Sequence, residues 1–308
     1  MLIDAHCDLL YQLWRHAYDV NQSNKLQFDL TKWRNSPVRI QAFAIFVPDD
    51  VPAYKQYDVA LKMVELFYEK IIVPNPDIVS IKTKKDIENI ADHQRGAILT
   101  LEGCHPIGRD LNKLKQLIDY GVRIVGLTWN NNNAIADSID HPHGKGLSSF
   151  GHEVINLLND EQIWTDVSHL SIKGFYDVIA TAHDVMASHS NAFTVCPHRR
   201  NLDDQQIAAL IKRDGWIGVT FVPYFTKVNE PVEIDDVMKQ IDYFLKRGAR
   251  EHLGFGSDFD GILTTIQNLE TVEDYVNIVE ALNKRYDKST VKQITGENFI
   301  RKFPRIKV

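Results

Sequence analysis

The chain has 308 residues, of which 44% are hydrophobic and 25% charged, and its formal net charge is −6. This composition predicts an ordinary soluble globular protein, and the acidic balance gives no basic surface for nucleic acid or a membrane. The longest apolar runs are too short to cross a bilayer, and the first residues predict a strand rather than a secretory signal. The only cysteines, Cys7, Cys104 and Cys196, predict a reducing compartment, so we expect a cytoplasmic protein.

Short apolar runs alternate with amphipathic stretches along the whole chain. We predict strands at 2–6, 39–46, 97–102, 122–128, 163–168, 184–189, 216–221 and 253–257. Helical periodicity lies between them, for example at 53–72, 110–120, 173–183, 203–214 and 234–248, and again after the last strand at 271–286 and 289–303. Because the strands are almost continuous runs of apolar residues, both of their faces are expected to be buried in a parallel sheet.

Eight strands that alternate with helices predict a (β/α)₈ barrel, and no linker or low-complexity tract divides the chain, so we expect one domain over 1–308. The alternative is an open, doubly wound sheet. That alternative is disfavoured because no GxGxxG motif follows the first strand. A phosphate-binding lysine loop and a GxSxG nucleophile motif are also missing from the sequence, which disfavours nucleotide-binding and serine-hydrolase functions.

Ionisable residues gather at the predicted carboxyl ends of the strands, which is where barrels carry their chemistry. In chain order they are His6, Asp8, Glu102, His169, His189, Asp258 and Asp260. A single histidine at such a place is more often a hydrogen-bonded core residue. Three histidines and several carboxylates at one rim instead predict a metal site.

This set of donors is too large for one catalytic zinc ion, which takes three protein ligands. It suits two ions that share a carboxylate and hold a hydroxide, and such ions lie about 3.5–4 Å apart. Mixed nitrogen and oxygen ligation favours zinc over other divalent ions without excluding Mn²⁺ or Co²⁺. His6 and Asp8 are therefore expected to be ligands, whereas Asp4 is expected to support them.

Seven segments give the chain a resemblance to the renal, or membrane, dipeptidases, which are binuclear zinc enzymes of the metal-dependent hydrolase barrels. The segments are "DAHCD", "LEGCHPI", "GLSSFG", "TDVSHLS", "SHSNAFTVCPHRRN", "GFGSDFDG" and "GENFIRKF". The resemblance implies that His6 and Asp8 bind one zinc ion and that His169 and His189 bind the other. It also implies that Glu102 bridges the two ions.

Two further roles follow from the same resemblance. Arg200 is expected to hold the terminal carboxylate of the substrate, a task that suits a planar guanidinium. Asp258 is expected to take a proton from the attacking water and pass it to the leaving amine. Arg199 and Asp260 neighbour these residues but match no role in the family.

The chain departs from the family at one position, after the segment "GVRIVGLT". Mammalian members carry a histidine there that polarises the scissile carbonyl, whereas this chain has Trp129. Bacterial members often have tryptophan, so hydrolysis is still expected, with Asn130, Asn131 or a metal ion in place of the histidine. We count Trp129 and Asn130 among the expected substrate-binding residues, and we expect Asn132 and Asn133 in a solvated loop.

Three other features carry less weight. The segment "HPHG" at 141–144 could form a third metal site, but a surface loop is the preferred interpretation. His105 is expected to support the ligands. Cys7 lies between two expected ligands and is expected to face away from the metals, so it is not a candidate nucleophile.

The sequence therefore predicts a zinc-dependent dipeptidase with two Zn²⁺ per chain, which cleaves small dipeptides through a metal-bridging hydroxide. The family often accepts a D-residue at the carboxyl side, and a homodimer is plausible by resemblance. One alternative is a related barrel hydrolase that acts on another small amide, a lactone or a phosphoester. The other is a non-catalytic metal-binding or scaffold protein. The "HxD" motif and Arg200 favour the dipeptidase over the related hydrolase, and the intact set of expected ligands argues against a non-catalytic protein.

Overall fold

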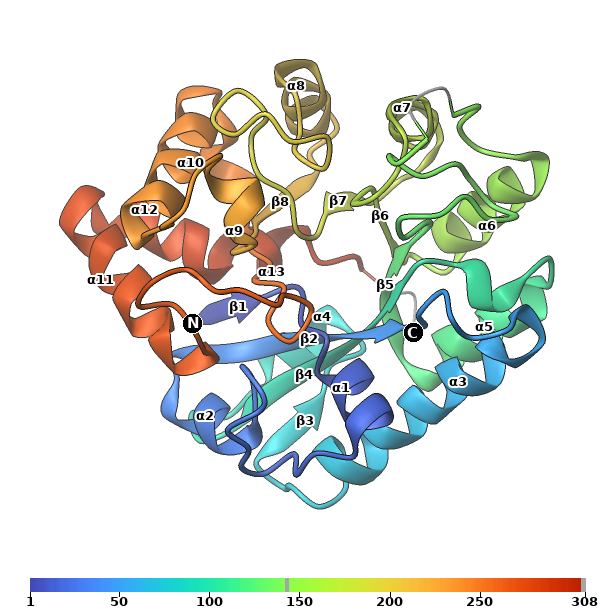
Figure 1. Cartoon of the computed structure of the whole chain (residues 1–308), viewed down its shortest axis with the longest axis horizontal. Helices are drawn as coiled ribbons and strands as arrows, with labels where there is room; N and C mark the ends of the chain where they lie inside the picture. Colours follow the sequence, from blue (N-terminus) through green and yellow to red (C-terminus); the bar gives the residue numbers. More distant parts are fainter. Residues whose placement is uncertain (142–143, 306–308) are drawn as a thin grey trace. The chain divides into compact units, whose positions relative to one another are not determined.

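The computed structural model describes residues 1–141 and 144–305. Its strands form one parallel sheet (Figure 1). They are β1 (Leu2–Asp4), β2 (Val38–Phe46), β3 (Ile78–Ser80), β4 (Arg95–Glu102), β5 (Val122–Gly126), β6 (Trp164–Asp166), β7 (Val185–Ala187), β8 (Trp216–Val219) and β9 (Leu253–Phe255).

The strand order is β2-β1-β9-β8-β7-β6-β5-β4-β3, and a further pairing of β2 with β4 closes the sheet. The eight strands other than β3 are the eight predicted from the sequence, and they form the expected (β/α)₈ barrel. Strand β3 was not predicted. It pairs with the first residues of β4, where Ile78 lies opposite Arg95.

The helices follow the predicted alternation with the strands. They are α1 (Leu9–His16), α2 (Leu30–Asn35), α3 (Ala53–Leu66), α4 (Lys84–Glu88), α5 (Leu111–Tyr120), α6 (Ser149–Asp160), α7 (Ile172–Thr181), α8 (Asp204–Lys212), α9 (Pro223–Thr226), α10 (Ile234–Lys246), α11 (Tyr275–Arg285), α12 (Lys288–Lys292) and α13 (Asn298–Lys302). Within the described ranges, none of these helices is long and apolar enough to cross a membrane.

Local sequence explains several helix boundaries. Helix α8 begins at a capping box in which the Asp203 carboxylate accepts a hydrogen bond from the Gln206 N–H, and the Gln206 side-chain oxygen accepts one from the Asp203 N–H. Ser148 caps α6 in a similar way by accepting from Gly151. Helix α5 ends at Gly121, whose φ of 114° suits a glycine.

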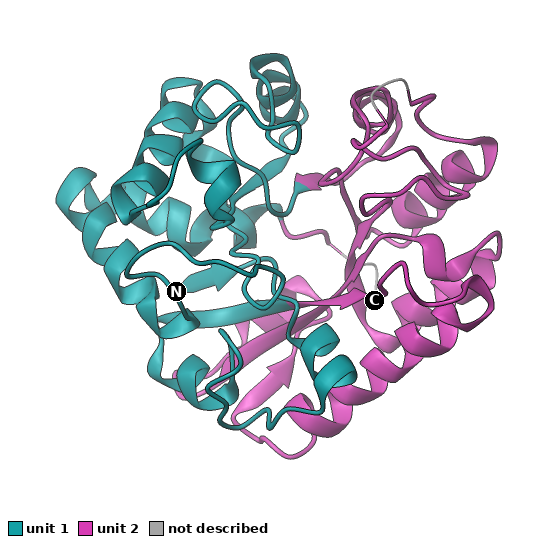
Figure 2. Ribbon diagram, viewed as in Figure 1, with its two compact units in different colours: residues 1–42, 187–302 teal, residues 43–186, 303–308 magenta. Residues whose placement is uncertain are grey.

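Contacts between residues divide the chain into two compact units, which Figure 2 colours separately. Unit 1 comprises 1–42 and 187–302, and unit 2 comprises 43–186 and 303–308. The boundaries fall inside β2 and β7, so each unit takes part of the sheet. The single domain expected over 1–308 stays a prediction.

Aromatic side chains form the core of unit 1 around the ends of β8 and β9. The Tyr275 ring lies 5.1 Å from that of Phe221 and 5.8 Å from that of Phe255, measured between centroids. Burial raises the pKa of its hydroxyl well above the ordinary value, and the charge of Asp4 at the end of β1 adds to that rise. The buried aromatic cluster therefore packs at the ends of β8 and β9, and β9 precedes the candidate residue Asp258.

Two glycines allow the end of β7 to approach β8 and β9 closely. A Cβ atom at Gly218 would lie 2.1 Å from the Ser188 carbonyl oxygen, and one at Gly256 would lie 1.9 Å from the same atom. Real Cβ atoms do not approach oxygen so closely, so both positions require glycine. The backbone that leads into His189 can occupy its place only because these side chains are missing.

Unit 2 has its own aromatic contacts. The ring of Phe43 on β2 lies 6.1 Å from Phe67, and the ring of Phe46 lies 4.8 Å from Trp129. Trp164 on β6 packs edge-on against Phe303, with their centroids 5.3 Å apart. The end of β2 therefore packs beside the segment that follows β5.

Several strands end earlier than the sequence predicts. Strand β1 ends at Asp4, β6 at Asp166 and β7 at Ala187, so His6, His169 and His189 lie two or three residues beyond their strands. In the segment 141–144, Pro142 and His143 lie outside the described residues.

Candidate metal centre

The first candidate residues follow β1 in unit 1, where the backbone leaves the sheet but stays beside the segment after β9. The Asp8 N–H donates to the Phe259 carbonyl at 2.9 Å, and the Asp258 N–H donates to the His6 carbonyl at 3.2 Å. His6 and Asp8 are each only 3% exposed, and His6 Nε2 lies 3.3 Å from Asp8 Oδ2. These two side chains therefore converge, as the "HxD" motif predicts.

Asp8 also occupies the position just before helix α1, which raises the simpler possibility that it only caps the helix. Its side chain accepts no capping hydrogen bond, and its backbone lacks the extended conformation typical of a cap. The Asp8 carboxylate points instead toward His6 and Asp258. This geometry favours a ligand role over a cap.

Asp258 follows strand β9 in unit 1 and lies beside His6. Its Oδ1 is 3.8 Å from His6 Nε2, and donor atoms of His6, Asp8 and Asp258 all lie within 4.8 Å of one another. A Cβ atom at Gly261 would lie 2.3 Å from Asp8 Oδ2 and 2.4 Å from Asp258 Oδ1. Gly261 therefore leaves the space that both carboxylates occupy.

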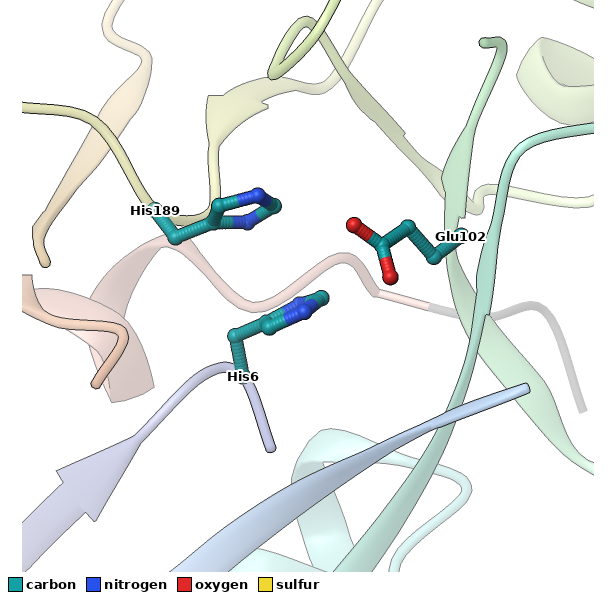
Figure 3. Close-up of side chains that lie close together, drawn as sticks. All are labelled: His6, Glu102 and His189. Atoms are coloured by element: carbon teal, nitrogen blue, oxygen red, sulfur yellow. The ribbon is translucent and has the colours of Figure 1, made fainter. Parts of the chain in front are cut away.

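His189 is the fourth candidate of unit 1. Its ring centroid lies 4.0 Å from that of His6 (Figure 3). Its Nδ1 lies 2.7 Å from the Ser188 hydroxyl oxygen. A hydrogen bond from Nδ1–H to that oxygen would leave Nε2 with the lone pair that a metal ligand needs.

The Asp4 carboxylate hydrogen-bonds to backbone and hydroxyl groups beside the candidate residues, which fits the supporting role expected from the sequence. The carboxylate accepts hydrogen bonds from the Ser257 N–H at 2.8 Å, the Ser257 hydroxyl at 2.6 Å and the His6 N–H at 3.2 Å. Asp4 thus ties the end of β1 to the end of β9. Burial raises the pKa of its carboxyl, and these hydrogen bonds oppose that rise.

Neighbouring buried groups are not suited to nucleophilic roles. Burial raises the pKa of the Cys7 thiol well above its ordinary value, which keeps it protonated. Burial also raises the pKa of Asp260 to about 7. The Asp260 carboxylate accepts hydrogen bonds from the N–H groups of Gln27 and Phe28, so it holds a loop in place.

Unit 2 brings together the remaining expected ligands. Glu102 is the last residue of β4 and is buried, and Figure 3 labels its side chain. Its Oε1 lies 3.1 Å from His169 Nε2. On the other side of the ring, His169 Nδ1 lies 2.8 Å from Asn130 Oδ1. His169 has a φ of 66°, a conformation that is uncommon for any residue except glycine.

Trp129 lies between this pair and a pocket in the same unit. Its ring centroid is 6.2 Å from that of His169. The pocket has a volume of about 280 Å³, and its lining residues are Asp49, Gln56, His105, Trp129, Asn131, Asn132, Asn133 and Ala134. The Asn131 amide donates to Asp49 Oδ2 at 2.6 Å, which joins two loops of the lining. Burial lowers the pKa of His105, so its imidazole tends to be neutral.

Arg200 is 7% exposed, and its guanidinium carbon lies 5.5 Å from the centre of the Phe225 ring. It shares its surroundings with Tyr224 and Asp258. Burial raises the pKa of the Tyr224 hydroxyl, the charge of Asp258 raises it further, and the charge of Arg200 lowers it. The rings of Tyr224 and Phe225 lie 4.7 Å apart, so Tyr224 and Arg200 pack against the same phenylalanine.

The sequence did not point to Tyr224 or to the serine partners of the site residues, and it named Asn130 for substrate binding rather than as a partner of His169. A signal for some of these partners was present, because a serine directly precedes three expected site residues, His169, His189 and Asp258. Two of these serines, Ser188 and Ser257, hydrogen-bond to a site residue or to its support, Asp4. Nothing in the sequence singles out Tyr224.

The donors in each unit fit divalent metal ions. Unit 1 offers two imidazoles and two carboxylates, and unit 2 offers one imidazole and one carboxylate, all from the carboxyl ends of strands. Buried carboxylates and imidazoles at such distances are stabilised by a cation, and this mixture of donors suits zinc and other first-row divalent ions.

A parallel barrel with imidazole and carboxylate donors at its strand ends fits the class of metal-dependent barrel enzymes. The chain belongs to the family described as membrane dipeptidase, peptidase family M19, whose model matches residues 1–307. It is therefore a metallo-dipeptidase, a hydrolase, and the resemblance seen in the sequence is confirmed.

Individual relatives agree with this assignment. An uncharacterized dipeptidase of Schizosaccharomyces pombe is 29% identical, and the match covers 96% of this chain and 77% of the relative. The crystal structure of "the dipeptidase AC", a metallopeptidase of family M19, is 26% identical, with a TM-score of 0.92 over 99% of this chain and 98% of that one. A metallopeptidase from Rhodobacter sphaeroides, solved with a phosphinate mimic of L-Ala-D-Ala, shares the fold at 24% identity, with a TM-score of 0.92 over 98% of this chain and 99% of that one.

Proposed function

We propose that the chain hydrolyses dipeptides with two divalent ions, Zn²⁺ by preference, and that it accepts a D-residue at the carboxyl side. The proposed ligands are His6 and Asp8 for one ion and His169 and His189 for the other, with Glu102 shared. The observation that carries the proposal is the convergence of buried donors within each unit, with His6 Nε2 3.3 Å from Asp8 Oδ2 and His169 Nε2 3.1 Å from Glu102 Oε1.

Such ions, when bound, lower the pKa of a water molecule toward about 7 and polarise the scissile carbonyl. The chain's own residues supply the rest. In our proposal, the Asp258 carboxylate takes a proton from the attacking water as the new C–O bond forms. It then delivers that proton to the amide nitrogen as the C–N bond breaks, so the products are two free amino acids.

Arg200 is proposed to bind the free carboxylate of the dipeptide. Its low exposure and its position near both Asp258 and Tyr224 support this role, because a buried guanidinium requires an anionic or aromatic partner. Recognition of the carboxylate would restrict cleavage to the last peptide bond of a short substrate, which distinguishes a dipeptidase from a general barrel hydrolase.

Trp129 takes the place of the carbonyl-polarising histidine of the mammalian members, and we propose that its indole forms a wall of the substrate site beside His169. The amide oxygen of Asn130 faces His169 rather than open space. Any contact of Asn130 with substrate would therefore be made by its amide nitrogen.

The proposal is tested by removing metal from the purified protein with a chelator and reloading it with Zn²⁺, Mn²⁺ or Co²⁺. We expect two ions per chain by elemental analysis and cleavage of L-Ala-L-Ala and L-Ala-D-Ala. His189→Ala should lose metal and activity, whereas His183→Ala, a change at an exposed histidine, should keep both. Only a trace of metal after reloading, or no cleavage of any dipeptide, would overturn the proposal.

Two expectations from the sequence stay predictions. A homodimer is expected by resemblance and can be measured by light scattering. The cytoplasmic location rests on the sparse cysteines, and Cys7, Cys104 and Cys196 are all buried and free of disulfides.

A further inference from the structure

The two ring nitrogens of His169 face different partners. Nε2 lies 3.1 Å from Glu102 Oε1, on the side where the proposed metal would bind. Nδ1 lies 2.8 Å from Asn130 Oδ1. A histidine can bind a metal through Nε2 only when that nitrogen carries a lone pair, so the proton of the neutral ring must sit on Nδ1 and requires an acceptor.

Asn130 is itself held in place by the loop that follows it. Its backbone carbonyl accepts a hydrogen bond from the hydroxyl of the buried Ser138 at 2.6 Å. The Ser138 N–H in turn donates to Asn132 Oδ1 at 2.8 Å. Asn132 is exposed in a loop, as expected, and its side chain also forms part of this hydrogen-bonded structure.

The adjacent residue, Asn133, folds the same loop back on itself. Its Oδ1 accepts from the N–H groups of Ile135 at 2.8 Å and Ala136 at 3.2 Å, and its Nδ2 donates to the Leu127 carbonyl at 2.7 Å. The asparagine run at 130–133 therefore has internal hydrogen bonds that fix its shape.

The same loop holds the backbone of His169. The His169 carbonyl accepts from the Thr128 hydroxyl at 3.1 Å and from the Ile139 N–H at 2.8 Å. These contacts offset the cost of its left-handed conformation, which is unfavourable for a residue other than glycine. Backbone and ring of His169 are thus positioned by one segment, 128–139.

We propose that Asn130 is a positioning residue for the metal centre, which fixes the Nδ1–H tautomer and the ring orientation of His169. This inference rests on the proposed ligand role of His169. Partners of this kind typically change metal affinity by about 10–100-fold when they are removed. An uncharged amide acceptor orients the ring without adding negative charge beside Glu102.

The test uses four forms of the full chain: wild type, Asn130→Ala, Asn130→Asp and Asn131→Ala. Each metal-free form is titrated with Zn²⁺ against a chromophoric chelator, and its thermal unfolding is followed by circular dichroism. Asn130→Ala should bind one ion as tightly as wild type and the other about 10–100-fold more weakly, with unchanged unfolding of the metal-free form. Asn130→Asp keeps an acceptor oxygen and should retain the affinity of wild type or exceed it.

Asn131→Ala is the matched control, because Asn131 is the next residue along and its amide donates to Asp49 instead. It should bind both ions as wild type does. If Asn130→Ala does not fold, Asn130→Ser, whose side chain is too short to reach Nδ1, carries the same expectation.

Two results would overturn the inference: wild-type affinity for both ions in folded Asn130→Ala, or equal losses in Asn130→Asp and Asn130→Ala. The second result would mean that metal affinity depends on packing of the Asn130 amide and not on its oxygen as the acceptor for His169 Nδ1–H. Failure of wild type to bind metal at all would instead overturn the proposed metal centre, so the two failures are distinguishable.

Discussion

Replacement of Arg200 by methionine separates carboxylate recognition from the remaining chemistry. Methionine preserves an unbranched apolar stem against Phe225 but removes the charge. A paired, charge-assisted contact is worth roughly 1.5–3 kcal/mol, and Arg200 is only 7% exposed, so water screens it little. At about 1.4 kcal/mol per tenfold, the KM of a dipeptide should rise about 10–100-fold, while kcat changes much less.

The assay follows release of free amino acids from L-Ala-L-Ala and from the same dipeptide with its carboxylate amidated. Wild type should prefer the free acid, and Arg200→Met should lose most of that preference. Arg199→Met is the matched control, since Arg199 is the neighbouring arginine but is exposed. If wild type cleaved both substrates equally well and Arg200→Met behaved like wild type on both, the assignment of Arg200 would be refuted.

Four further outcomes are expected. Asp258→Asn should lower kcat about 10²–10⁴-fold with both ions still bound, and an unchanged kcat would rule out the proton-carrying role. Glu102→Ala should lose metal by elemental analysis and abolish dipeptide cleavage; retention of both ions with most of the activity would contradict the shared ligand. Gly261→Ala should weaken metal binding by roughly tenfold or more, because the new Cβ would lie within 2.4 Å of the Asp8 Oδ2 and Asp258 Oδ1 atoms. Wild-type metal affinity in this variant would show instead that the two carboxylates can move. Cys7 should resist iodoacetamide in the native enzyme, since burial raises its pKa, and peptide mass spectrometry that found it alkylated without unfolding would contradict this.

The barrel could be predicted from the sequence because its eight strands are apolar runs that require burial on both faces. Strand β3 was not predicted because it is three residues long and only its Ile78 is buried, which makes its apolar pattern weak. Strand ends were less predictable. Beyond β6 and β7 the sequence turns polar. The Val167 N–H still donates to Met186 of β7 and the Ser190 N–H to Gly218 of β8, but the regular strand pairing has ended, so His169 and His189 lie beyond the sheet.

The expected ligands could be named from the sequence because their types are few and each lies at the end of a strand or just beyond it. The alternation of Asp4, His6 and Asp8 suggested one strand with three side chains on the same face. Strand β1 ends at Asp4, however, and the Asp4 carboxylate accepts a hydrogen bond from the Ser257 hydroxyl. Side-chain partners could not be predicted. Asn130 meets His169 across 39 positions of sequence, and only the folded loop between β5 and α6 brings the amide to the ring.

Three glycines described above have a consequence for how the protein tolerates mutation. Gly218 and Gly256 each face the Ser188 carbonyl, and Gly261 faces the carboxylates of Asp8 and Asp258, at distances that admit only hydrogen. Every amino-acid replacement of glycine adds at least a Cβ. In a saturation mutagenesis screen scored by dipeptide-dependent growth, these positions should therefore be as intolerant as the histidines, although they carry no functional group. A screen of that kind would therefore identify the positions at which the proposed metal centre requires space rather than a functional group.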